Sequence, residues 1–270
     1  MKRVTILIIS ILIFASCGEK QNDADKKVTC SFTTPANNAV VYNNIEIILT
    51  VSTSATVNKV EFYLDGSLIG SVISVPYNIK WTPKDIDAGN HTLTCIAIPA
   101  VGEDTRSEIV IVVELKLSDS FKGGKIFYID ETHKHGLIAA AADITLNSSN
   151  TFFYGSHNLI GASDINNGKD NTLKMANASL SSAYAGYAFK NGYELNGYND
   201  WYIPAQEQLK ILKENQDYVG GFSTQSNTAS YWSSTELSFD TAFALNFVAL
   251  MGTNVTKGVY SYRIRPIRDF

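Results

Sequence analysis

Seven short runs rich in β-branched and aromatic residues follow one another between residues 28 and 115, with turn signals between them. They read VTCSF, IEIILTVS, KVEFYLDG, SLIGSVI, YNIKW, HTLTCIAI and SEIVIVVEL. Such residues favour extended backbone, and Asp65-Gly66 between two of the runs is typical of a hairpin turn. Seven short strands within about 90 residues predict an all-β sandwich of two packed sheets.

The predicted sandwich contains two cysteines. Cys95 shares a strand face with Leu93 and Ala97, because side chains alternate along a strand, and we expect that face to point inward. Cys30 lies on the first predicted strand. An inter-sheet disulfide between Cys30 and Cys95 suits an exported protein, but the sequence does not fix the separation of the Cα atoms. The sequence therefore leaves two possibilities open, a Cys30–Cys95 disulfide or two free thiols. We expect Trp81 in the core.

The same segment resembles the immunoglobulin-like modules of bacterial surface proteins. The resemblance rests on TTPANNAVV, VNKVEFYLDGSLIG, PYNIKW and AGNHTLTCIAI, and is strongest over residues 60–66 with the following Pro76, Tyr77 and Trp81. It covers almost all of residues 28–117. It implies an immunoglobulin-like sandwich that serves as a spacer or as a binding module.

The N-terminal segment MKRVTILIISILIFASC has two basic residues, an apolar run and small residues before Cys17. This order predicts a signal peptide over residues 1–16, and the run is shorter than the roughly 20 residues of a spanning helix. Small residues before a cysteine resemble a bacterial lipobox, which implies that Cys17 carries the lipid. Residues 17–27 are almost entirely polar and predict a disordered tether. We expect a lipid-anchored protein of the cell envelope, at the outer membrane, facing either the periplasm or the outside.

The charge balance excludes one class of partner. A net charge of −4 and a pI near 5.6 leave no basic footprint for nucleic acid. Besides Cys17 the chain has only two cysteines, too few for a cysteine zinc framework.

Composition shifts after Leu117 towards Gly, Asn, Ser and Tyr, and DSFKGGKIFYID opens a second unit. Apolar residues recur at helical spacing over 171–192, at Leu173, Ala176, Leu180, Ala183, Tyr184 and Tyr187. Asp170, Asn171 or Thr172 could cap that helix. A second helix is expected over about residues 205–215. With short strands elsewhere, the sequence predicts an α+β domain over residues 118–270.

Several motifs of this unit resemble the DUF1566 family, which includes the C-terminal domain of a Legionella collagen-like adhesin. In order they are GGKIFYID, HGLIAAAAD, NT at 171–172, NGYNDWYIPAQEQL, YWSSTE and YRIRPIRDF. The resemblance covers about 150 residues. It implies a variant of the C-type-lectin-like fold and extracellular recognition, in some members of sulfated glycans. It implies no settled catalytic activity.

Two tryptophans of these motifs follow turns. We expect Trp201 and Trp232 in the core, because large aromatic rings supply most of the buried area in a loop-rich domain. Pro204 suits a helix start. The family resembled has Ser and Glu where this chain has Ala205 and Gln208, so we expect the side-chain cap to be lost at a cost of about 1 kcal/mol.

Binding residues are expected on the long loops 147–170 and 217–230 and on the turn 194–200, since loops held by a scaffold carry function. Sugars have apolar C–H faces and hydroxyl groups, so aromatic rings together with amides and carboxylates suit them. The candidate binding residues on these loops are Tyr154, His157, Asp164, Asn166, Asn196, Tyr198 and Asn199. Arg263 and Arg265 share a strand face and could bind sulfate or carboxylate. The alternative is that they pair with acidic neighbours such as Asp200 and Asp269.

Metal and catalytic signals are weak. His133 and His135 beside Asp130 and Glu131 read as a charged turn, so no metal is expected there. Asp164, Asn166 and Asp170 could offer oxygen ligands to Ca²⁺, but the position of the twelfth EF-hand ligand is Met175. No nucleophile motif, phosphate loop or carboxylate pair stands out. We therefore expect a protein without cofactor that is not an enzyme.

The sequence favours a lipid-anchored binding protein of adhesin type whose second domain recognises a glycan or glycoprotein. A structural or assembly component that binds a surface protein is the alternative, and an unrecognised hydrolase is the third reading.

The anchor can be tested at one residue. Cys17→Ser should release the protein from the membrane fraction or block its processing, because no thiol would remain to carry the lipid. Metabolic labelling with a fatty acid, followed by fractionation, measures this. Unchanged labelling of the variant would contradict the lipid anchor.

Overall fold

The computed structural model describes residues 27–145, 151–249 and 251–270. The predicted signal peptide, Cys17 and the tether up to residue 26 lie outside these ranges. None of the helices within them has the length and hydropathy that crossing a bilayer requires.

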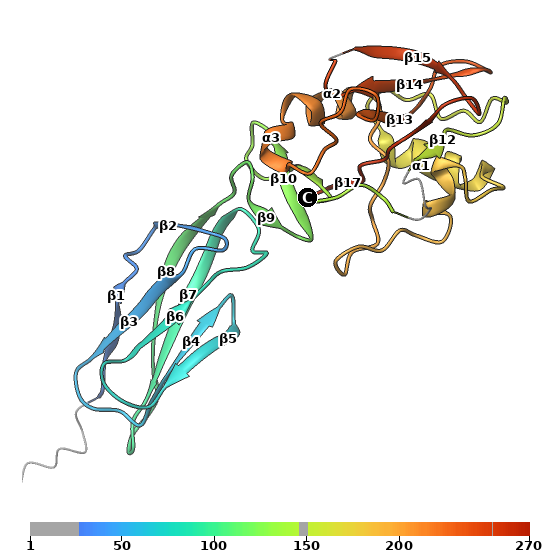
Figure 1. Cartoon of the computed structure of the whole chain (residues 1–270). Coiled ribbons are helices and arrows are strands. Elements are labelled where there is room, and N and C mark those ends of the chain that lie inside the picture. Colours follow the sequence, from blue (N-terminus) through green and yellow to red (C-terminus); the bar gives the residue numbers. More distant parts are fainter. Residues whose placement is uncertain (1–26, 146–150, 250) are drawn as a thin grey trace, which may run out of the picture.

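The first domain is a sandwich of two sheets, as predicted (Figure 1). One sheet has the order β1-β3-β6, and its strands span Cys30–Thr34, Ile47–Thr53 and Asn78–Trp81. The other has the order β2-β8-β7-β4-β5, with strands Ala39–Tyr42, Thr105–Glu114, Gly89–Ile98, Lys59–Leu64 and Ser67–Val72. All strand pairs of the sandwich are antiparallel except β2 with β8. The seven predicted runs correspond to strands, and β2 is an addition.

The inner faces of the two sheets form a core. Leu93, Cys95 and Ala97 are fully buried, so the inward face predicted for β7 is confirmed. Trp81 is partly buried against the same core. The predicted hairpin at Asp65-Gly66 joins β4 to β5, and both residues have positive φ, which the tight turn requires.

The two cysteines approach each other across the sandwich. Cys30 on β1 and Cys95 on β7 are free thiols whose sulfur atoms lie 3.7 Å apart. The hydrogen bond from the Cys95 thiol lowers the pKa of Cys30 to about 7. The thiolate is the form that attacks in thiol chemistry, so this pair is placed for oxidation.

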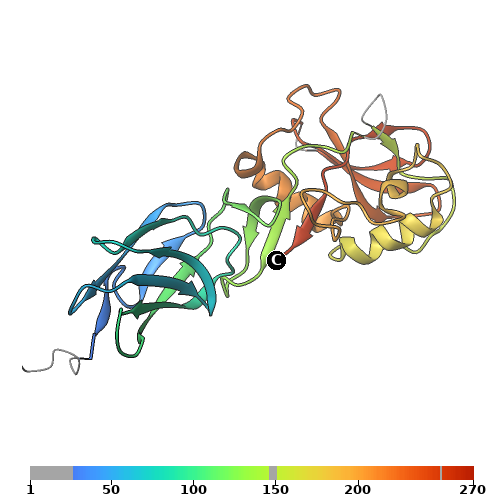
Figure 2. The same cartoon turned by 90° about the horizontal axis from the view of Figure 1, so that it is seen from below.

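The second domain mixes strands with short helices (Figures 1 and 2). A four-stranded sheet has the order β17-β11-β10-β9, from Ile267–Asp269, Gly136–Ala139, Gly124–Ile129 and Ser120–Phe121. A three-stranded sheet runs β13-β14-β15, from Ser230–Glu236, Thr241–Asn246 and Gly252–Thr256, and β12 (Phe152–Phe153) pairs with β16 (Ser261–Tyr262). The helices are α1 (Gly168–Ala178), η2 (Ala185–Phe189), α2 (Gln206–Glu214) and α3 (Gln216–Val219).

The helix predicted over 171–192 is wrong in extent and in face. The α-helix ends at Ala178, and a separate 3-10 turn, η2, follows. Leu173 and Leu180 are 62% and 86% exposed, whereas Met175 and Thr172 are buried. The cap is Asn167, whose side chain accepts from the N–H of Asp170. Tertiary packing has overridden the apolar period here.

The second helix, α2, begins one residue after its predicted start. Ala205 offers no side-chain cap, as predicted, but two other side chains bond the backbone at this end of the helix, Gln208 of α2 itself and Thr235 of β13. Gln208 Oε1 accepts from the N–H of Ala205 at 3.0 Å, and Thr235 Oγ1 on β13 accepts from the N–H of Gln206 at 2.9 Å. The side-chain cap at Ala205 is therefore absent, and Thr235 satisfies one of the first N–H groups of α2 through a tertiary contact.

Trp201 and Trp232 are buried in one large cluster, as predicted. The indole N–H of Trp232 donates to the Phe152 carbonyl at 2.7 Å, and that of Trp201 donates to the Leu195 carbonyl at 3.0 Å. Both rings therefore combine a large buried surface with a satisfied donor, which suits a domain with short regular elements.

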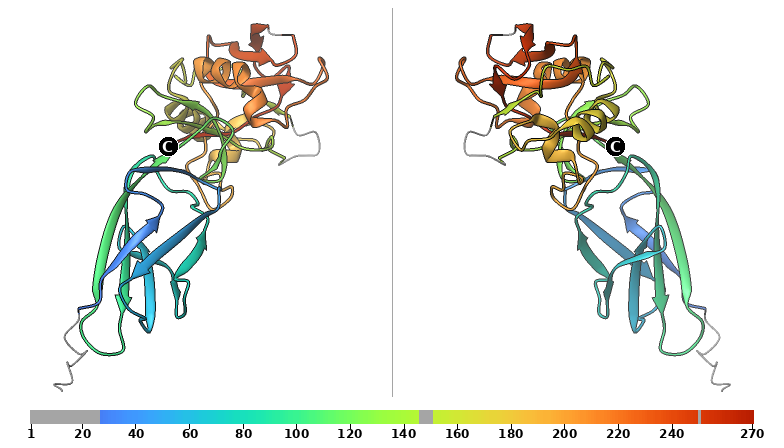
Figure 3. Two further views of the ribbon diagram at one scale, coloured as in Figure 1. Left: turned by 90° about the vertical axis from the view of Figure 1, so that its left-hand side faces the viewer. Right: turned by 90° about the vertical axis from the view of Figure 1, so that its right-hand side faces the viewer.

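The two domains meet end to end (Figure 3). Asn44 Nδ2 donates to the Ser120 carbonyl at 2.8 Å, and the Lys122 N–H donates to Asp85 Oδ1 at 2.6 Å. The Lys122 ammonium pairs with Asp87 at 2.5 Å. Strand β1 begins at the end of the sandwich remote from the second domain (Figure 1).

The cysteine pair generates a prediction. Mild oxidation should convert both thiols into a disulfide that closes a span of 65 residues and stabilises the sandwich by about 4 kcal/mol. Thiol titration of the denatured, unreduced protein and denaturant unfolding measure this. A Cys30→Ser, Cys95→Ser double variant should unfold at the same denaturant concentration with and without reductant. Two titratable thiols after oxidation would contradict the pairing.

Candidate functional site

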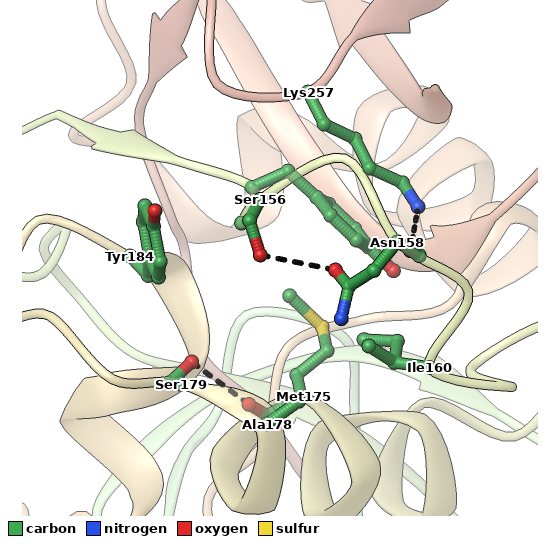
Figure 4. Close-up of a pocket in the computed structure, with 10 residues that line it drawn as sticks. Ser156, Asn158, Ile160, Met175, Ala178, Ser179, Tyr184 and Lys257 are labelled. Carbon is green, nitrogen blue, oxygen red and sulfur yellow. Dashed lines mark hydrogen bonds between the residues drawn. The ribbon is translucent and has the colours of Figure 1, made fainter. Parts of the chain in front are cut away.

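Tyr154 is buried beside Trp232 rather than exposed on a loop. Its hydroxyl donates to the Ser234 carbonyl at 2.8 Å. Burial, together with the nearby Glu236 carboxylate, raises the pKa of Tyr154 well above its ordinary value. The adjoining cavity, shown in Figure 4, has a volume of about 10 Å³, room for one water molecule at most. Tyr154 is therefore a core residue, which corrects its nomination as a ligand contact.

Lys257 lines this cavity and forms a buried ion pair with Glu236, which was not predicted from the sequence. Lys257 Nζ lies 2.6 Å from Glu236 Oε1 and also donates to the carbonyls of Asn158 and Phe239. The Glu236 carboxylate accepts the N–H groups of two further residues, Ile160 and Gly161. The pair therefore ties three loops together. His157, a nominated residue, lies at this end of the domain and pairs with Asp240 at 2.9 Å.

Asp164 and Asn166 lie in the exposed turn before α1. Asp164 Oδ1 accepts the N–H groups of Asn166 and Asn167 at 2.8 and 2.9 Å, and these bonds lower the pKa of Asp164. The carboxylate thus closes the turn on itself. Within the described ranges, no three His, Cys, Asp or Glu side chains cluster in a way that could hold a metal ion.

Asn196, Tyr198 and Asn199 lie on the turn that faces the junction of the two domains. Asn196 has φ +55° and donates from its amide to the Gly123 carbonyl at 2.7 Å. The Arg268 guanidinium lies 4.0 Å from the centroid of the Tyr198 ring. Asn199 is exposed. Two of these three nominated residues, Asn196 and Tyr198, line a cleft at the junction.

Arg263 and Arg265 converge on Asp143, at 3.2 and 2.8 Å. Arg263 also donates to the Thr228 carbonyl at 2.9 Å. Arg265 is fully buried, and its guanidinium donates to the carbonyls of Ala140, Gly220 and Gly221. Both arginines therefore pair with an acidic neighbour, which was the alternative to ligand binding. The partner is Asp143 rather than Asp200 or Asp269. Arg265 cannot reach a ligand, which corrects its nomination.

These two arginines fix the loop 217–230 beside a cleft of about 550 Å³, which we call the loop cleft. It is lined by Lys213, Gln216, Asp217, Gly220, Gly221, Phe222, Ser223, Thr224, Phe247 and Val248. Its volume lies within the usual range of small-molecule sites, about 300–1,000 Å³. The lining residues come from α2, from α3, from the loop after α3 and from the segment after β14, which contributes Phe247 and Val248. Helix α3 lies against β10 (Figure 1).

The floor of the loop cleft is held rigidly. The Phe222 ring packs against Phe247 at 4.8 Å between centroids, and the Arg265 guanidinium lies 4.0 Å from the Phe222 centroid. Gly221 has φ +68°, and a Cβ atom there would come within 2.7 Å of the Ala141 carbonyl oxygen. Burial and the Asp143 carboxylate raise the pKa of Tyr231, which packs beneath Phe222, to about 12. The aromatic floor therefore presents one fixed shape.

The sequence predicted binding on the loop 217–230, but none of the residues that line the loop cleft was singled out. Gly220-Gly221 followed by Phe222 was the available signal, since two glycines before an aromatic ring permit a backbone turn that exposes the ring.

Comparison with known proteins gives a family match within the first domain and similarity to several solved structures. Residues 29–95 match the bacterial Ig domain family. A solved structure of the fibronectin(III)-like modules of Clostridium thermocellum CbhA is 29% identical, covers 32% of this chain and 95% of its own, and gives a TM-score of 0.26. The endo-beta-1,4-mannanase of Thermotoga petrophila is 15% identical, with coverages of 36% and 22% and a TM-score of 0.28.

A Bacteroides uniformis beta-glucuronidase is 16% identical, with coverages of 31% of this chain and 10% of its own and a TM-score of 0.25. A search of curated proteins finds no match to this chain. The sandwich is thus a bacterial immunoglobulin-like domain, with the family match at residues 29–95.

Proposed function

We propose that this chain is a lipid-anchored binding protein of the cell envelope that recognises a glycan or glycoprotein through the loop cleft of its second domain. The observation that carries the proposal is the loop cleft itself, where an immobilised aromatic floor meets a polar rim. Residues 118–270 would then be a C-type-lectin-like domain of the DUF1566 type, and the activity would be binding rather than catalysis.

The chemistry of the loop cleft suits a saccharide. Sugars present apolar C–H faces together with hydroxyl groups. Phe222 offers an aromatic surface, while Gln216, Asp217 and Thr224 offer amide, carboxylate and hydroxyl groups on the rim. A site with both kinds of group can orient a sugar ring through its face and its hydroxyls at once.

The immunoglobulin-like domain would act as a spacer. Strand β1 starts at the end of the sandwich away from the second domain, so a lipid on Cys17 would leave the sandwich between the membrane and the second domain (Figures 1 and 3). A tether of about ten polar residues would add reach.

A second candidate function is assembly through a partner protein. It is favoured by exposed apolar side chains near the Lys257–Glu236 pair, namely Leu159, Phe239, Val259 and Tyr260, which are 67%, 53%, 58% and 52% exposed. Exposed apolar residues that gather in one region are typical of protein contacts. This surface and the loop cleft can be tested separately.

Glycan-array binding of the chain from residue 27 tests the proposal. Phe222→Ala and Gln216→Ala should each weaken binding of the best array ligand by about tenfold, since each removes a contact worth on the order of 1.4 kcal/mol. Calorimetric titration gives the affinity, and the melting temperature shows whether the variant is folded.

Phe239→Ala is the matched control, because it removes an exposed phenylalanine outside the loop cleft. It should leave glycan affinity unchanged. If Phe239→Ala abolishes binding while Phe222→Ala and Gln216→Ala retain full affinity, the assembly surface is the functional one. Absence of any glycan ligand on a broad array would speak against saccharide recognition itself.

A further inference from the structure

A second cleft lies where the two domains meet, and we call it the junction cleft. Its volume is about 510 Å³. The sandwich contributes Asn44, Lys84 and Asp85, and the second domain contributes Ser120, Phe121, Gly123, Gly124, Lys125, Ala141, Asn196 and Tyr198. Small-molecule sites occur preferentially at domain interfaces, and this volume is ordinary for them.

The two lysines of the junction cleft have no carboxylate partner among the residues that the structure describes. Lys125 Nζ donates to the Ser118 carbonyl at 3.0 Å, and Lys84 is exposed. The neighbouring cations differ from them. Lys122 pairs with Asp87, and Arg268 binds Asp200 through two nitrogens at 2.7 and 2.8 Å. Two ammonium groups, one from each domain, therefore stay available at the junction cleft.

The one carboxylate in the lining is already engaged. Asp85 has φ +54° and accepts the N–H of Lys122 at 2.6 Å, which fixes the chain where the second domain begins. The lining thus has two cations against one anion, in a protein whose net charge is −4. An anionic group entering the junction cleft would meet locally favourable charge.

The remaining polar groups suit a sugar ring. The Tyr198 ring, held against Arg268, and the Asn196 amide lie on one wall. Gly123 has φ +90°, and a Cβ atom there would lie 2.8 Å from the Tyr198 ring, so glycine is required for this wall to form. A phenol and an amide can bind the hydroxyl groups of a ligand whose carboxylate reaches the lysines.

We propose that the junction cleft binds a uronic-acid residue of an acidic saccharide, with its carboxylate between Lys84 and Lys125 and its hydroxyl groups on the wall of Asn196 and Tyr198. The ligand would bridge the two domains. The junction cleft is separate from the loop cleft, although Ala141, which lines it, lies against Gly221 of the loop cleft. The inference therefore does not depend on the function proposed for the loop cleft.

The test uses trigalacturonate, with its methyl ester as a neutral ligand of the same shape, titrated against the chain from residue 27. The acid should bind with an affinity that falls as salt rises, and the ester should bind at least about tenfold more weakly. Lys84→Ala and Lys125→Ala should each weaken binding of the acid about fivefold, the upper range for a partly exposed pair. Lys169→Ala removes an exposed lysine of α1 and should change nothing.

Three results would overturn the proposal. One is equal affinity for the acid and the ester, because charge would then play no part. Another is unchanged affinity in both lysine variants while Phe222→Ala abolishes binding, since the acid would then occupy the loop cleft. The third is no binding of the acid up to about 10 mM, weaker than a millimolar site allows. Melting temperatures close to that of the parent protein verify that the variants are folded.

Discussion

The buried ion pair between Arg265 and Asp143 is the interaction on which the architecture of the second domain most depends. The Arg265 side chain is fully buried, so each of its donors must find an acceptor inside the protein. It finds the Asp143 carboxylate and the carbonyls of Ala140, Gly220 and Gly221. One side chain near the last strand therefore fixes the segment after β11 and the turn after α3. Removal of one partner from such a pair typically costs 3–5 kcal/mol, because the other charge is left uncompensated.

Two further buried cations follow the same principle. Lys257 joins Glu236 to the carbonyls of Asn158 and Phe239, and Arg268 joins Asp200 to the Lys122 carbonyl. A domain with long loops has many carbonyl groups outside strand ladders, and each needs a donor when it is buried. Buried cations supply several donors each. The loops that form the clefts can then keep one conformation without regular secondary structure.

The sequence predicted the parts whose signal is local. Strand runs of the sandwich alternate in and out, so their faces followed from the period of two, as for Cys95 on β7. The short parallel strand β2 was missed because its pairing with β8 is not local. Helical spacing over 171–192 predicted the wrong buried face, since Leu180 is exposed and the polar Thr172 of α1 is buried. The loop cleft was beyond sequence reasoning for a similar reason: Lys213, Phe222 and Phe247 meet there only through the fold.

The positions of the cations bear on how the net charge of the chain would affect an acidic ligand. An acidic chain should repel an acidic polymer at long range, unless cations gather in a local patch. Arg263, Arg265 and Arg268 form ion pairs with carboxylates of the protein itself, so they offer no binding site for an anionic ligand. Lys84 and Lys125 have no carboxylate partner among the described residues, and they lie in the lining of one cleft. Because salt screens exposed charges beyond roughly 8 Å at physiological ionic strength, these two ammonium groups govern the junction cleft more than the net charge does.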